Sequence, residues 1–168
     1  MATRREMREA VFALLFETGF HAEADPAEIL AAAQREREIE EAPYIENTYL
    51  GAMRKKAALD VLIGRFSNGW KTTRMSHVSR AVLRLCAYEM LYSDVPMQVA
   101  LNEAIELAKK YDDPKARPFV NGVLNSIKNE IETVGKEACA LKYEEAAQSS
   151  EELAVEDDTA DAAEEEQQ

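Results

Sequence analysis

Glycine, proline and cysteine are scarce in this chain of 168 residues, and each scarcity argues against a class of structure. The six glycines and five prolines supply few turn signals, and no window alternates β-branched with polar residues over the length of a strand. The two cysteines, Cys86 and Cys139, lie far apart without a CxxC pair, which indicates neither a disulfide framework nor a zinc site. The composition therefore predicts an all-α protein from a reducing compartment.

Long apolar runs are absent as well. Every apolar stretch is far shorter than the roughly 20 residues that a membrane-spanning helix needs. The N-terminus begins with charged residues and lacks the apolar core of a signal peptide. We therefore expect a cytoplasmic protein that is not inserted in a membrane.

The sequence also lacks catalytic motifs: it contains no GxxxxGK[ST], no GxSxG, no HExxH and no GxGxxG after a strand. Its two histidines, His21 and His77, lie in a turn and beside a helix cap, which are positions typical of surface residues. Glu103 and Glu106 share a helix with apolar residues, where a carboxylate is more often ion-paired than an acid or base. These observations predict a protein that is not an enzyme and holds no metal and no cofactor.

Positive charge is missing from the end of the chain. Residues 144–168 contain eleven acids and no lysine or arginine, so the formal charge of −12 belongs mostly to this segment. With few large apolar residues, it cannot bury enough surface to offset the entropy lost on ordering. We predict one helical domain over residues 1–143 and a disordered acidic tail over residues 144–168. The tail either aids solubility or folds back onto basic residues of the domain.

Apolar residues recur at spacings of three and four along most of the domain, a pattern typical of amphipathic helices packed in a bundle. Helix caps and prolines divide this pattern into about six to seven helices. We expect helices from Thr3 to about residue 18, over residues 27–41, over residues 44–66, from Ser76 to about residue 92, from near Pro96 to Lys110, and from after Pro114 to about residue 143, with Gly135 as a candidate break before a piece over residues 136–147. The connection over residues 64–73 contains the single tryptophan, Trp70.

Arg4, Arg5 and Arg8 gather at the start of the first helix, and their spacing places three guanidinium groups on one side of its first two turns. Positive charge there opposes the helix dipole, at a cost of roughly a few tenths of a kcal/mol. Glu6 and Glu9 offset this only in part. Two interpretations stay open: a solvated helix start with Glu/Arg pairs, or an anion-binding arm whose planar guanidinium forks suit phosphate oxygens.

A second group of candidate binding residues follows Pro114. Lys115 and Arg117 supply positive charge, and Phe119, Asn121 and Gly122 come directly after them. Single-stranded RNA is recognised by cations that contact phosphates and by aromatic rings or amides that contact unstacked bases. The alternatives are that Phe119 is a core residue and that Asn121 and Gly122 relieve close helix packing.

A possible protein-binding surface lies on the helix that follows Ser76. Arg80, Arg84, Tyr88 and Tyr92 fall off its apolar stripe, and tyrosines beside arginines are common in protein interfaces. Partial burial of the tyrosines explains the pattern equally well. These four residues are the predicted partner surface.

Several fragments, in order and at family-like spacing, resemble the NusB family of bacterial transcription antitermination factors. They are Thr3-Arg4-Arg5, Arg8-Glu9, Leu15-Phe16, Trp70, the stretch over residues 74–80, Val82-Leu83-Arg84-Leu85, Ala87-Tyr88-Glu89, Asp94-Val95-Pro96, and the stretches over residues 101–110 and 119–125. Together they cover about residues 3–130. The resemblance implies an all-α fold of two packed helical sub-bundles. Residues 22–60 share little with the family beyond periodicity, and the acidic tail is not part of its pattern.

The resemblance also implies a function and its site. NusB proteins bind the boxA element of ribosomal RNA transcripts together with the ribosomal protein NusE, in a complex with other Nus factors and RNA polymerase. By position, Arg4, Arg5, Arg8, Phe119, Asn121 and Gly122 match the family's RNA face, and Lys115 and Arg117 are added for their charge. We expect an antitermination factor that binds boxA-type single-stranded RNA with NusE, and a homodimer is an option for the free protein. The alternative is a helical protein-interaction module without specific RNA binding.

Overall fold

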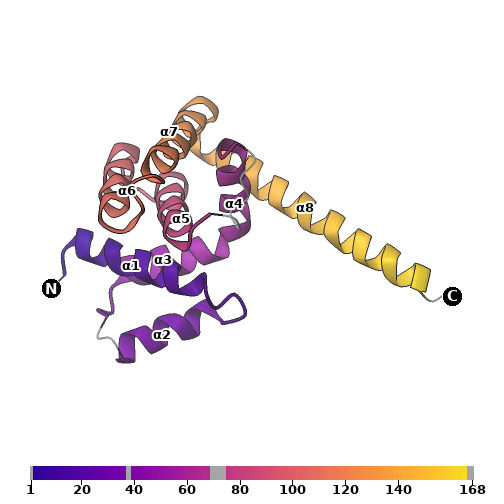
Figure 1. Cartoon of the computed structure of the whole chain (residues 1–168), viewed down its shortest axis with the longest axis horizontal. Coiled ribbons are helices and arrows are strands. Elements are labelled where there is room, and N and C mark those ends of the chain that lie inside the picture. The colour runs from indigo at the N-terminus through magenta and orange to yellow at the C-terminus, as the bar shows by residue number, and fades with distance from the viewer. Residues whose placement is uncertain (1, 37–38, 69–74, 166–168) are drawn as a thin grey trace.

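The computed structural model describes residues 2–36, 39–68 and 75–165, and every regular element in these ranges is an α-helix (Figure 1). The helices are α1 (Arg4–Thr18), α2 (Pro26–Glu36), α3 (Pro43–Arg54), α4 (Lys56–Phe66), α5 (His77–Tyr92), α6 (Met97–Tyr111), α7 (Arg117–Val134) and α8 (Lys136–Glu165). The prediction of an all-α fold is confirmed. Trp70 and Arg74 lie outside the described residues. Within the described ranges, no helix is both long and apolar enough to cross a membrane.

Helix α5 is the centre of the fold. Residues 81–87 are all buried, and α5 packs against α1, α3, α4, α6, α7 and α8. Helices α1 to α3 contact one another on one side of it, while α4, α6, α7 and α8 gather on the other (Figure 1). A helix contacted on so many sides must be apolar around most of its circumference, which explains its nearly continuous apolar sequence.

A buried ion pair fixes α1 on α5. The Arg8 guanidinium donates from Nε to Glu89 Oε1 at 2.7 Å and from its second terminal nitrogen to Oε2 at 3.1 Å. The Arg8 side chain is 5% exposed and that of Glu89 is 1% exposed. A forked pair of this kind satisfies both groups only in one orientation of α1. The pair therefore determines which face of α1 is turned toward α5.

The single helix expected over residues 44–66 is two helices, and this prediction is wrong. The chain bends at Lys55 (φ −97°, ψ 8°), which ends α3 and precedes α4. Lys55 then reaches Glu144 on α8 at 2.6 Å, and Tyr88 of α5 lies so close over Gly51 that a Cβ atom there would collide with its ring. These tertiary contacts set the bend, while the apolar spacing continues across it and gives no sign of a break.

Gly135 ends α7 as predicted, with a φ of +93° that glycine adopts without steric cost. Helix α8 then packs mainly on α4, with Cys139, Tyr143 and Ala147 buried at four-residue spacing. The predicted domain boundary at residue 143 thus falls inside α8, one turn before the last of these buried residues.

The acidic segment, which the sequence predicts to be a disordered tail, follows the packed part of α8. The backbone of α8 stays helical to Glu165 and projects away from the other helices (Figure 1). Residues 148–154 are all exposed, so nothing packs against this part of the helix. Its alanine and glutamate content favours helix locally, which explains regular backbone without tertiary contacts.

Truncation should separate the packed part of α8 from the unpacked part. A chain that ends after Ser150 should keep the free energy of unfolding of the full chain, because the described side chains that it loses, those of residues 151–154, are exposed. A chain that ends after Val134 should lose at least about 3 kcal/mol, the usual cost of removing one large buried aromatic side chain such as Tyr143. Urea denaturation measures both, and equal midpoints for the two truncations would contradict the packing of α8.

The Arg8–Glu89 pair should be costly to break from one side. Glu89→Gln should reduce the free energy of unfolding by about 3 kcal/mol, because it removes the forked partner of the buried Arg8 charge and leaves only the more distant Glu103 carboxylate at 3.7 Å. The double variant Arg8→Met/Glu89→Leu should recover most of that loss, since no buried charge remains. Glu106→Gln, which removes the solvent-exposed ion pair with Lys109, is the control and should leave the urea midpoint unchanged. If Glu89→Gln lowered the urea midpoint no more than this control does, the Arg8–Glu89 pair would not be the anchor of α1.

Candidate nucleic-acid interface

The three arginines at the start of α1 do not share one exposed side, which corrects the expected cluster. Arg8 is turned inward onto Glu89 and is not available at the surface. Arg5 faces α6, where its Nε and a terminal nitrogen donate to Glu103 at 3.1 and 2.9 Å. Arg4 leans to the other side and lies over the Tyr44 ring, 4.1 Å from its centroid. The exposed cations at the start of α1 are therefore Arg4 and Arg5.

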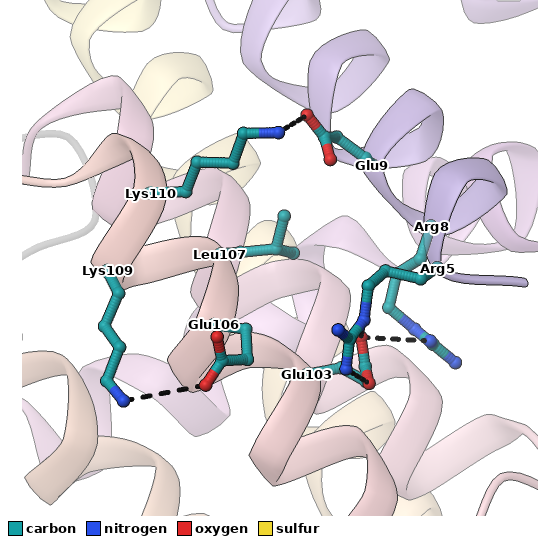
Figure 2. A pocket seen from close by; sticks show the side chains of 8 residues that line it. All are labelled: Arg5, Arg8, Glu9, Glu103, Glu106, Leu107, Lys109 and Lys110. Carbon is teal, nitrogen blue, oxygen red and sulfur yellow. Dashed lines mark hydrogen bonds and ion pairs between the residues drawn. The ribbon is translucent and has the colours of Figure 1, made fainter.

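A hollow of about 300 Å³ lies between α1 and α6, and we call it the Arg5 hollow (Figure 2). It is lined by Arg5, Arg8, Glu9, Glu103, Glu106, Leu107, Lys109 and Lys110. Figure 2 shows cationic and carboxylate side chains around Leu107. Its charged groups are mostly paired with one another, so an anion that enters must compete with carboxylates already in place.

The pairs of the Arg5 hollow are close. Lys110 Nζ lies 2.7 Å from Glu9 Oε1, and Lys109 Nζ lies 3.6 Å from Glu106 Oε1. The hydrogen bond from Arg5 lowers the pKa of Glu103 below its ordinary value, and the bond from Lys110 lowers the pKa of Glu9 in the same way. Both carboxylates consequently stay ionised at neutral pH and hold their cations.

The Phe119 hollow, of about 460 Å³, lies where α7 begins beside the start of α5. Its lining consists of Met75, Ser76, Ser79, Asp113, Lys115, Ala116 and Phe119. The Ser76 hydroxyl caps α5 by accepting from the Ser79 amide at 3.0 Å, and the Ser79 hydroxyl donates to Asp112 at 2.7 Å. Lys115 has no ion-pair partner in the described part of the chain. A free cation and a half-buried aromatic ring thus meet at a helix N-terminus, where the dipole favours anions.

The other predicted residues of α7 turn away from this hollow. A terminal nitrogen of Arg117 donates to the Lys109 carbonyl at 2.8 Å, so Arg117 holds α7 to the end of α6. Asn121 is half-buried, and its side-chain oxygen has no hydrogen-bond partner among the described groups. Gly122 is exposed, and a Cβ atom there would touch nothing within 4 Å. The alternative that Gly122 relieves close helix packing is therefore wrong.

The two predicted binding regions meet through the last turn of α6. On one side Lys110 bonds Glu9 of α1, and on the other the Lys109 carbonyl accepts from Arg117 of α7. The start of α1 and the start of α7 thus flank the same helix end. They open into separate hollows, since Arg5 and Phe119 line no hollow in common.

An aromatic strip, which the sequence pattern did not predict as a surface feature, lies between the hollows. It consists of Phe12, Phe16, Phe20, His77 and Tyr111. Ring centroids are 5.0 Å apart for Phe12 and Tyr111 and 3.9 Å apart for Phe20 and His77. Phe20 is 57% exposed and Tyr111 is 41% exposed. The available signal was the recurrence of phenylalanine at every fourth residue from Phe12 to Phe20, but this spacing is equally typical of a wide buried helix face.

The strip borders both hollows. Tyr111 follows Lys110 of the Arg5 hollow, and Val78, next to Ser79 of the Phe119 hollow, helps line an apolar dent of about 210 Å³ with Phe12, Phe16 and Tyr111. On the Arg5 side a cation meets the strip directly, since Lys110 Nζ lies 5.3 Å from the Tyr111 ring centroid. We call the Arg5 hollow, the strip and the Phe119 hollow together the aromatic–cationic face.

The predicted partner surface on α5 is not one open surface. Arg84 is buried and forks onto Asp60 of α4, with both contacts at 2.8 Å. Arg80 is half-buried and donates to the Met75 carbonyl at 3.2 Å, and burial lowers its pKa. Tyr88 and Tyr92 stack on each other with centroids 5.6 Å apart. Arg84 thus serves a contact with α4 and Arg80 a contact with the segment before α5, so the arginines are engaged in internal contacts.

Known proteins resemble this chain both in sequence and in fold. The sequence model of the NusB family matches residues 5–129. Transcription antitermination protein NusB of Bacillus pumilus is 43% identical over 129 residues, which are 76% of this chain and 96% of the relative. No metal-binding group of three or more His, Cys, Asp or Glu side chains occurs within the described ranges.

Two solved structures show the same arrangement of helices. NusB of T. maritima superimposes with a TM-score of 0.70 at 36% identity, covering 77% of this chain and 92% of that chain. A complex of antitermination factors NusB and NusE with double-stranded RNA contains a chain that superimposes with a TM-score of 0.67 at 26% identity, covering 76% of this chain and 96% of that chain. By sequence and by fold, this chain belongs to the NusB family.

Proposed function

We propose that this protein is a transcription antitermination factor that binds boxA-type single-stranded RNA of ribosomal RNA transcripts together with NusE. Other Nus factors and RNA polymerase join the complex through these two components, in the cytoplasm where transcription takes place. The aromatic–cationic face is the observation that carries the proposal. The protein acts by binding, and no covalent step is assigned to it.

The chemistry of this face suits an unpaired strand. Lys115 and Arg5 supply cations for phosphate oxygens, and the exposed rings of Phe20 and Tyr111 offer flat surfaces on which unstacked bases can lie. A duplex hides its base faces, so it would leave these rings without partners. The strip therefore favours a single strand over double-stranded RNA.

The paired state of the Arg5 hollow explains why a protein partner is needed. A phosphate near Arg5 must exchange with Glu103, which lies 2.9 Å from the guanidinium, and gains little net energy in doing so. Affinity for RNA alone should accordingly be modest. The relatives are transcription antitermination proteins, and one similar chain is solved with NusE and RNA, which supports NusE as the partner.

The direct experiment is fluorescence anisotropy with a labelled boxA-type RNA, a scrambled RNA of the same composition and the boxA strand annealed to its complement. Each is titrated with the protein alone and with the protein and NusE. We expect the single boxA strand to bind most tightly and NusE to strengthen that binding. Equal binding of all three RNAs, with no effect of NusE, would favour the protein-interaction module instead.

Substitutions of cations and of a neighbouring acid on this face should change RNA affinity in opposite directions. Arg5→Gln and Lys115→Gln should each weaken binding and reduce the slope of log affinity against log salt by about 0.7, as for one lost phosphate contact on a single strand. Glu103→Gln should strengthen binding, because it frees Arg5 and removes a negative charge.

Arg54→Gln is the matched control for these variants. Arg54 is an exposed cation at the end of α3 and lines neither hollow of the aromatic–cationic face. Its substitution should leave both affinity and slope unchanged. If Arg54→Gln had the same effect as Arg5→Gln, binding would reflect overall charge and not this surface.

A further inference from the structure

A third hollow, of about 480 Å³, lies on the other side of the α1 start from the Arg5 hollow. Its lining includes Arg4, Tyr44, Asn47, Tyr88, Tyr92 and Asp94, from α1, α3, α5 and the loop after α5. We propose that this tyrosine groove binds a nucleotide that flanks the RNA segment held by the aromatic–cationic face. The inference rests on the proposed function and extends its binding site.

Arg4 and Tyr44 form one wall of the groove. The Arg4 guanidinium uses one planar face to stack on the Tyr44 ring at 4.1 Å, and the exposed Arg4 side chain has no carboxylate partner in the described part of the chain. The Tyr44 hydroxyl is buried without a hydrogen-bond partner among the described groups. A stacked guanidinium that keeps its N–H donors free suits both a base and a phosphate.

Tyr88 and Tyr92 line the groove from α5 and stack on each other, with centroids 5.6 Å apart and ring planes 27° apart. Tyr88 lies across the backbone at Gly51, where any side chain would displace it, and its hydroxyl donates to the Asn47 carbonyl at 3.4 Å. The Tyr92 hydroxyl donates to Glu144 of α8 at 2.8 Å. Both rings are therefore fixed in place before any ligand arrives, which lowers the entropic cost of stacking.

The position of the groove favours RNA over other ligands. Arg4 and Arg5 are consecutive, yet Arg5 points to Glu103 on α6 and Arg4 points to Tyr44 on α3. The first turn of α1 is thus a ridge between two binding surfaces, and a strand that leaves the Arg5 hollow across this ridge enters the groove. Asp94 contributes the one acid of the lining, which disfavours a phosphate beside it and leaves the Arg4 wall as the phosphate side.

An RNA length series tests the proposal on the intact protein with NusE. A minimal boxA-type RNA is compared with RNAs extended by a few nucleotides at the 5′ end or at the 3′ end. We expect an extension at one end only to tighten binding about tenfold, in the range of one base stacked on an aromatic side chain. No gain at either end would overturn the proposal while leaving binding of the minimal RNA, and hence the proposed function, intact.

Tyr88→Leu is the discriminating variant, because it keeps apolar bulk over Gly51 but removes the ring. It should abolish the gain from the extension and leave the affinity for the minimal RNA within about twofold of the parent, since a leucine offers no π-face. Arg54→Gln, at an exposed cation outside the groove, should keep the gain. If Tyr88→Leu instead weakened NusE binding in the absence of RNA, the groove would be a protein contact and the proposal would fail.

Photo-crosslinking provides a readout that needs no variant. With 4-thiouridine placed in the flanking segment of the extended RNA, the crosslinked peptide should contain Tyr44, Tyr88 or Tyr92. Crosslinks confined to the aromatic strip would overturn the groove assignment. If the minimal RNA does not bind at all, the proposed function itself is wrong. If the minimal RNA binds but the extension adds nothing, only the groove proposal is wrong.

Discussion

The buried pair between Arg8 and Glu89 sets the arrangement of the whole surface around α1. On a helix, the residues three and four positions before a given one lie to either side of it. With Arg8 held inward by Glu89, Arg5 must lean toward α6 and Arg4 toward α3, as their contacts with Glu103 and Tyr44 show. One internal contact thus divides a run of arginines into an anchor and two separate surface cations.

Helix α6 gives this surface its charge balance. It contributes Glu103 and Glu106 as well as Lys109 and Lys110, so every acid placed against α1 is accompanied by a base. The resulting hollow is polar without being strongly positive, and long-range attraction of RNA should be weak. Discrimination must then come from contacts at short range, and the aromatic strip is the part of the surface that can provide them.

The helices were predictable from the sequence because apolar spacing and caps act locally. Gly135 as the end of α7 and Thr3 as the cap of α1 are examples, and both occur where expected. The bend at Lys55 was not predictable, since it depends on Tyr88 of α5 and Glu144 of α8, which are distant in sequence. Long-range contacts of this kind leave no trace in periodicity.

The site residues likewise fall into those that the sequence located correctly and those whose orientation depends on distant partners. Charge and motif located the regions of Arg5, Lys115 and Phe119, which the structure finds at surface hollows. The inward turn of Arg8 and Arg84 depended on Glu89 and Asp60, partners that sequence spacing alone does not identify. An amphipathic pattern also does not distinguish an aromatic side chain inside the core from one at its edge, which is why the aromatic strip was not predicted.

Helix α8 lies beyond the residues that match the NusB family, yet ion pairs and hydrogen bonds tie it to the other helices at two points. Glu144 joins Lys55 and Tyr92, and Glu130 of α7 holds Arg65 and Lys142. Beyond these contacts the helix runs away from the rest of the molecule (Figure 1). The backbone of this part of α8 therefore runs away from the start of α1 (Figure 1), and electrostatic effects at physiological salt fade within about 8 Å. To compete with RNA, the acidic segment would have to lie next to the aromatic–cationic face, where its negative charge would repel the strand. Because α8 runs away from that face, this geometry supports the solubility interpretation of the segment.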